Sequence, residues 1–179
     1  MSQKNLFFEG SAHVPLLIMP PQGRSLPHNI SVEAPADLVD IYPTILAMAG
    51  LSSPVSVSGR NLLEPVPMDR IFFGNSLNRN FCVMEEKVKL VYSAVGDHVL
   101  LFDLNTDPME QHNLAEDPAW QERKAKLWKL LLEHTAQYTP EALDEKGQFL
   151  TYEAPHFPGD VPGRWFGFHY HDYSVDTFH

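Results

Sequence analysis

The first third of the chain carries two apolar segments with different spacing. Residues 13–19 read His-Val-Pro-Leu-Leu-Ile-Met, and two prolines close the run. Such a continuous run is typical of a strand buried on both faces. Residues 40–49 repeat apolar side chains at helical spacing, which predicts a helix with Asp40 as its N-cap and Gly50 as its C-terminal stop. The two segments together predict one strand and one helix of an α/β sheet.

The pattern changes after residue 68, where short runs rich in Phe, Val, Ile and Tyr alternate with turn residues. We expect an antiparallel meander of four strands, at residues 70–74, 81–86, 88–93 and 99–104. Asp117 and Pro118 then predict the start of a second helix that ends near Gln137. Its apolar stripe consists of Trp120, Leu127, Leu130, Leu131 and His134. A helix with one such stripe packs across a face of the sheet, so we predict an α/β fold class that is α+β in the C-terminal part.

Composition and charge narrow the function classes. The 179 residues are 44% hydrophobic and 20% charged, which is typical of a globular protein. The formal net charge of -10 argues against nucleic acids and anionic membranes as partners, because the long-range field repels them. No apolar stretch approaches the roughly 20 residues of a membrane span. Cys82 is the single cysteine, so an internal disulfide is excluded, and we expect its thiol to be buried in a strand.

Three stretches stand out as motifs and follow one another along the chain. The first is KNLFFEGSAHVPLLI at residues 4–18. The second is VDIYPTILAMAGL at 39–51, followed by SGRNLLEPV at 58–66. The third is KLVYS at 89–93, followed by LFDLNTDPMEQHNLAEDP at 101–118. Together they resemble the C-terminal part of the sulfatase family, which belongs to the alkaline phosphatase superfamily.

This resemblance implies a domain organisation. Residues 1–67 would be the end of the large sulfatase α/β domain, to which they contribute a strand and a helix. Residues 68–137 would be the C-terminal subdomain, with its four-stranded antiparallel sheet and packed helix. Residues 138–179 are covered by none of these motifs and are rich in Pro, Gly and aromatic residues. We expect this tail to pack on the rest of a partial sulfatase fold.

The resemblance also implies a chemistry. Sulfatases hydrolyse sulfate esters with a formylglycine, which is made from the Cys or Ser of a Cys/Ser-x-Pro-x-x-Arg motif, and with a calcium ion held by aspartates. The 179 residues contain no such motif, so we expect the chain alone to be inactive and calcium to belong to the intact family enzyme. The family's sulfate-binding lysine corresponds to Lys4. A fixed ammonium stabilises the negative charge that develops on the sulfate oxygens in the transition state.

Two further groups of polar residues are candidate sites. Asp103, Asn105 and Asp107 imitate the start of a calcium loop, but the sixth position is proline where an EF-hand needs glycine. We therefore predict a structural turn there. His169 and His171, two residues apart in the tail, are candidates for binding a sulfated sugar. Ordinary packing of the tail and a metal site are the alternatives for this pair.

Three kinds of protein are consistent with these observations. The chain is a piece of a sulfatase, or half of a split enzyme that assembles with a separate N-terminal sulfatase half, or a non-catalytic binding or interaction module. The family acts on sulfated sugars, aryl sulfates, steroid sulfates and choline sulfate, and the motifs do not select among them. Many sulfatases are exported, which makes a periplasmic or extracellular location an expectation for the intact enzyme only.

Overall fold

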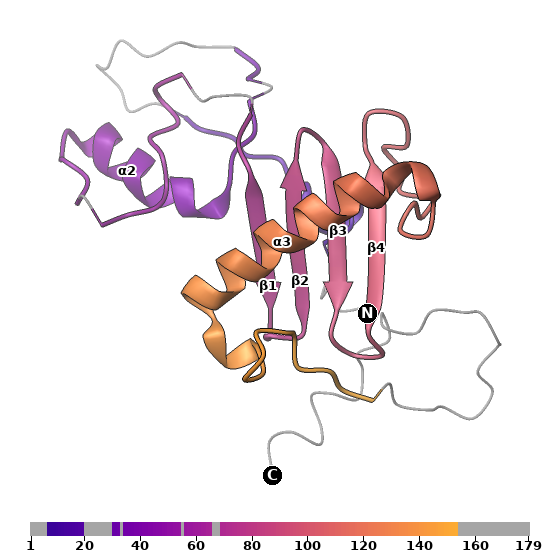
Figure 1. The fold of residues 1–179 in the computed structure, drawn as a ribbon. Coiled ribbons are helices and arrows are strands. Elements are labelled where there is room, and N and C mark those ends of the chain that lie inside the picture. The colour runs from indigo at the N-terminus through magenta and orange to yellow at the C-terminus, as the bar shows by residue number, and fades with distance from the viewer. Residues whose placement is uncertain (1–6, 20–29, 33, 55, 66–68, 154–179) are drawn as a thin grey trace, which may run out of the picture. The chain divides into compact units, whose positions relative to one another are not determined.

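The computed structural model describes residues 7–19, 30–32, 34–54, 56–65 and 69–153 (Figure 1). The chain divides into two compact units. The sheet unit comprises Met1–Val14 and Ile71–His179, and the α2 unit comprises Pro15–Arg70. Each unit is described by itself below.

The sheet unit contains the predicted antiparallel meander. Its strands follow the order β1-β2-β3-β4. Their bounds are β1 Phe72–Ser76, β2 Asn80–Glu85, β3 Val88–Ser93 and β4 His98–Asp103. Tight turns join the strands, and each turn holds two residues with positive φ, which suits the right-handed twist of the strands. These turn residues are Leu77 with Asn78, Glu86 with Lys87, and Gly96 with Asp97.

One long helix covers one face of this sheet, as the apolar stripe predicts. A 3-10 turn, η2 (Pro118–Trp120), leads into α3 (Gln121–Tyr138), and the Asp117 carboxylate caps the turn by accepting the N–H of Ala119 at 2.9 Å. Figure 1 shows α3 lying across all four strands. Leu127 and Leu131 of α3 are fully buried. They pack into the core with side chains of β2, β3 and β4, including Phe81, Val83, Leu90, Tyr92 and Leu101.

The predicted stripe faces the sheet as far as His134, which is half-buried. Thr135 is the last residue of α3 that is fully buried. The His134 ring stacks on Phe73 of β1, with centroids 3.8 Å apart and ring planes 2° from parallel. The described part of the tail continues this core: Phe149 is buried, and Tyr152 forms an isolated parallel bridge with Val95.

The α2 unit differs from the prediction in its first segment. Residues 15–19 are extended but form no strand, and among the described residues they find no ladder partner. Leu17 and Met19 are 93% and 88% exposed. A strand buried on both faces needs neighbouring strands and covering helices, and the described residues supply neither. The prediction of a strand at 13–19 is therefore wrong for this chain.

The predicted helix of the α2 unit is present, but Asp40 has a different role in it. A 3-10 turn, η1 (Leu38–Asp40), precedes α2 (Ile41–Ala49), and Gly50 ends the helix at φ 75°. Asp40 was expected to cap α2, but its side chain makes no cap hydrogen bond to that helix. Its carboxylate is fully buried and paired with Arg70. Asp37, one turn earlier, supplies the cap by accepting the N–H of Leu38 at 2.6 Å.

Candidate functional site

The residues that the sequence singled out for substrate binding lie outside the part of the chain that the structure describes. Lys4 precedes the first described residue, Phe7, and His169 and His171 follow the last, Glu153. The described residues closest in sequence to Lys4 are Phe7 and those that follow it. The candidate site is therefore built from that segment and from what holds it.

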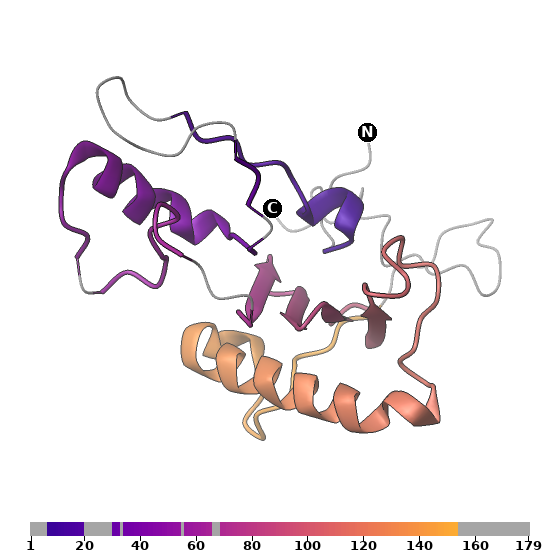
Figure 2. The same cartoon turned by 90° about the horizontal axis from the view of Figure 1, so that it is seen from above.

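Residues 7–12 lie on the face of the sheet opposite α3, where α1 (Glu9–Ala12) forms a single helical turn (Figure 2). Phe7 and Phe8 pack against the buried Cys82 and Val91. The thiol is thus buried in a strand as predicted, and burial raises the pKa of Cys82 to about 12. A glycine in β1 admits the Phe7 ring, because a Cβ at Gly74 would lie 2.5 Å from it. The aromatic segment is therefore fitted to the sheet.

A buried lysine binds the same segment through its backbone and a carboxylate. Lys89, the second residue of β3, places its Nζ 2.8 Å from the Phe7 carbonyl oxygen and 2.5 Å from Glu9 Oε1. Nζ also lies 2.7 Å from Glu110 Oε1, and Glu110 Oε2 accepts the backbone N–H of Glu9 at 2.6 Å. The side chains of Lys89 and Glu110 are each only 3% exposed. We call Lys89, Glu9 and Glu110 the lysine clamp.

The electrostatics of the clamp favour an ionised Glu9. Burial by itself would raise the pKa of Glu9, but the hydrogen bond and charge of Lys89, with a smaller contribution from His13, lower that pKa overall. Glu9 is therefore a carboxylate at neutral pH. A buried ion pair of this kind contributes little net stability compared with an apolar replacement, but removing one partner leaves a buried charge without its counterion.

A strained loop carries Glu110 to the clamp. Glu110 has φ 55°, a left-handed conformation that is uncommon outside glycine and costs about 1 kcal/mol. Two side chains organise this loop: Asp107 accepts the N–H of His112 at 2.8 Å, and Asn113 accepts the N–H of Leu101 at 2.9 Å. The loop is thus held at both ends by side chains that bind its backbone.

The turn at the start of that loop is structural, as the sequence predicts. Asp103 accepts the N–H and the side-chain amide of Asn105 at 3.1 and 2.9 Å, and the Thr106 hydroxyl at 2.9 Å. Burial would raise the pKa of Asp103, but these hydrogen bonds lower it overall. Within residues 7–153, as far as they are described, no three His, Cys, Asp or Glu side chains form a group that could hold a metal ion.

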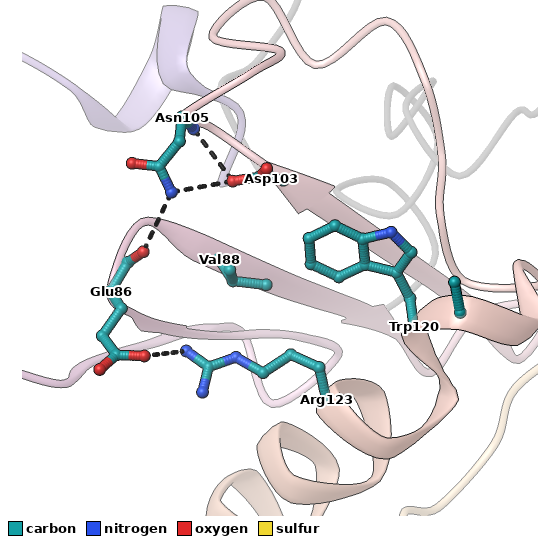
Figure 3. Close-up of a pocket in the computed structure, with 7 residues that line it drawn as sticks. Glu86, Val88, Asp103, Asn105, Trp120 and Arg123 are labelled. Atoms are coloured by element: carbon teal, nitrogen blue, oxygen red, sulfur yellow. Dashed lines mark hydrogen bonds and ion pairs between the residues drawn. The ribbon is translucent and has the colours of Figure 1, made fainter.

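Figure 3 shows a pocket of about 570 Å³ beside this turn. It is lined by Glu86, Val88, Asp103, Asn105, Ala119, Trp120 and Arg123. Its charged groups already have partners: Arg123 lies 2.8 Å from Glu85 and 3.0 Å from Glu86, and the Asp103 carboxylate is held by the turn. The pocket presents an indole wall and a paired guanidinium, but no nucleophile with an adjacent base.

Sequence reasoning missed the role of Lys89 and Glu110. Lys89 alternates with apolar residues in β3, which alone indicates a solvent-facing lysine. One feature of the sequence could have indicated this role: Lys89 is the first residue of KLVYS, which is part of a family motif. Nothing in the local pattern indicates that residues 7–12 cover this face.

Comparisons with known proteins agree with the motifs. No family model matches the chain. Arylsulfatase K of Bos taurus is 34% identical over 131 residues, covering 63% of this chain and 24% of the relative. A choline-sulfatase of Rhizobium meliloti is 33% identical over 166 residues, covering 83% of this chain and 31% of the relative. The chain thus spans about a quarter to a third of the length of these curated relatives.

Solved structures give a weaker likeness. A structure described as a putative sulfatase from Bacteroides thetaiotaomicron shares 21% identity, with a TM-score of 0.48. The match covers 67% of this chain and 29% of that one. The assignment to a family therefore rests on the sequence relatives.

Proposed function

This chain belongs to the sulfatase family, and we propose that it forms the C-terminal part of a sulfuric ester hydrolase. The observation that carries this proposal is the 33% identity to a choline-sulfatase over 166 residues, because that match takes in 83% of the chain. The resemblance of the ordered motif stretches supports the same function. Sulfate esters as a class are the substrate, and the relatives suggest an aryl sulfate and choline sulfate as the first probes.

Within this function we assign sulfate binding to Lys4. Its ammonium would hold a sulfate oxygen and stabilise the negative charge that grows there as the ester bond breaks. The contacts of the lysine clamp support this role indirectly, since they hold Phe7 and Glu9, which come soon after Lys4 in sequence, on the sheet. His169 and His171 remain proposed contacts to the organic part of the substrate.

Calcium and the nucleophile belong, in this proposal, to the N-terminal half of the intact enzyme. The described residues do not fit a calcium site, since no group of donors among them could hold a metal ion. The Cys/Ser-x-Pro-x-x-Arg motif is also not among the 179 residues. We therefore expect no turnover of sulfate esters by these residues alone.

The α2 unit supports an N-terminal sulfatase half as partner. The extended segment at 15–19 leaves Leu17 and Met19 almost fully exposed. Ile45 and Leu38, at 57% and 73% exposed, add to the apolar surface of this unit. Apolar surface of this kind is the typical lining of a protein interface, and the large sulfatase sheet is the partner that the family resemblance offers.

The test is sulfate release from 4-nitrophenyl sulfate and choline sulfate. The chain is assayed alone and after co-expression with an N-terminal sulfatase half that carries a matured formylglycine, taken from the choline-sulfatase relative. We expect no turnover by the chain alone, and turnover by the assembled pair that falls at least 100-fold on Lys4→Ala. A soluble pair without activity would contradict the proposed function. Activity of the chain alone above its Lys4→Ala control would contradict the proposal that the nucleophile and calcium belong to the N-terminal half.

A further inference from the structure

The lysine clamp is the point where the first and the third motif stretches meet in space. Glu9 belongs to KNLFFEG, Lys89 to KLVYS, and Glu110 to LFDLNTDPMEQHNLA. Glu9 and Glu110 are 101 residues apart in sequence, yet the N–H of the first donates to the carboxylate of the second. A contact that joins these two stretches is a candidate for a shared function.

We propose that Lys89, with Glu110, is a positioning residue for Lys4. The inference rests on the proposed function, in which Lys4 binds sulfate. Lys89 fixes the backbone at the Phe7 carbonyl oxygen and the side chain of Glu9, so the chain is held at two points, at the third and the fifth residue after Lys4 in sequence. Three residues span at most about 11 Å when extended, so a fixed Phe7 sets the point from which the chain reaches back to Lys4.

The chemistry of the clamp favours positioning over stabilisation as its purpose. Burying the Lys89 ammonium and the Glu110 carboxylate, with Glu9 partly buried beside them, is costly, and well-packed apolar residues would hold the sheet equally well or better. The strained φ of Glu110 adds to this cost. The clamp instead fixes the orientation of the backbone. Charge-assisted hydrogen bonds restrict the position of a carbonyl and of an N–H group more tightly than apolar contacts do.

The first test uses hydrogen exchange on the 179-residue chain. The amides of residues 7–12 are compared in the wild type, in Lys89→Met and in Lys129→Met, which makes the same chemical change at a lysine that is 77% exposed. We expect Lys89→Met to speed exchange in residues 7–12 at least 10-fold while β3 keeps its protection. Lys129→Met should match the wild type. Unprotected amides at residues 7–12 in the wild type would overturn the inference that the clamp holds this segment.

The second test is a double-mutant cycle in the assembled pair. Lys89→Met is expected to lower kcat at least 10-fold when Lys4 is present, and less than 2-fold in the Lys4→Ala background, because it acts through Lys4. Equal losses in both backgrounds would overturn the positioning role and leave the proposed function standing. A wild-type pair that does not hydrolyse sulfate esters would instead overturn the proposed function and this role with it.

A charge-free variant keeps the cycle informative if Lys89→Met fails to fold. Glu9→Gln, Lys89→Met and Glu110→Gln together remove every charge of the clamp and leave an amide oxygen for the Glu9 backbone N–H. We expect this triple variant to fold, with kcat reduced at least 10-fold. Wild-type kcat in the folded triple variant would show that the clamp positions nothing, and would overturn the inference.

Discussion

Replacing Asp40 by alanine distinguishes two roles for this residue that differ in magnitude. As an N-cap, the role that the sequence indicates, Asp40 would contribute about 1 kcal/mol. In the structure its carboxylate is buried, pairs with Arg70 at two oxygens, and accepts the backbone N–H groups of Asp37 and Arg60 at 2.8 and 2.7 Å. Asp40→Ala leaves a mostly buried guanidinium without this partner, which costs about 3–5 kcal/mol.

Hydrogen exchange of the α2 amides is the suitable assay, because the described tryptophans, Trp120 and Trp128, both lie in the sheet unit. Since each 1.4 kcal/mol is about tenfold, Asp40→Ala should reduce α2 protection by about 100-fold to several thousand-fold, or abolish it. Asp37→Ala is the matched control, since it removes only the cap and should cost about 1 kcal/mol. Equal effects of the two substitutions would refute the buried-pair reasoning.

The same carboxylate predicts a pH dependence. Burial would raise the pKa of Asp40, but the hydrogen bonds from Arg70, Arg60 and Asp37 lower it overall. The unfolded chain therefore takes up the proton first, at about pH 3.9. The stabilisation is complete above that value and is lost as the pH falls through the folded pKa. Circular dichroism of the wild type and of Asp40→Asn between pH 6 and pH 3 should show a steeper loss in the wild type.

Three further predictions concern the sheet unit. Gly74→Ala should destabilise it by about 1–3 kcal/mol in urea unfolding, because the new Cβ meets the Phe7 ring, while Gly10→Ala has open space and should be neutral or slightly stabilising. Burial lowers the pKa of His134, so stability should fall as the pH drops below the unfolded value of about 6.5; His134→Phe should remove that part of the slope. Leu131→Ala should cost about 2–5 kcal/mol by tryptophan fluorescence, and a cost under 1 kcal/mol would show that the core there is loosely packed.

The sheet and its helix could be predicted because their signals are local. Each hairpin is set by two adjacent turn residues, and the strands between them are enriched in β-branched and aromatic side chains. The start of the last helix is likewise marked by Asp117 and Pro118 in sequence. Predicted strand bounds differ from the observed ones by no more than two residues at any end. Patterns of this kind depend only on neighbours in the chain, so a single sequence carries them.

The predictions that were wrong concern features that are not local, since they depend on which distant residues cover or pair with a side chain. The run at 13–19 has the composition of a doubly buried strand, but burial needs a sheet that the described residues do not provide. Asp40 has the residue type and place of a cap, but Arg70, thirty residues later, takes its carboxylate. Lys89 has the alternation of an exposed lysine, but residues 7–12 cover it. In each case a segment distant in sequence determines whether the residue is buried and which partner it has.

The strongest motif of the sequence, LFDLNTDPMEQHNLA, gains a physical explanation from this distinction. Its acidic and amide side chains suggest cation binding, yet Asp103 and Asn113 accept backbone N–H groups and shape the loop. In the loop shaped in this way, Glu110 has a strained φ, and its carboxylate reaches Lys89 and the N–H of Glu9. Through Glu110 the motif therefore holds Glu9, a residue 101 positions away in the sequence.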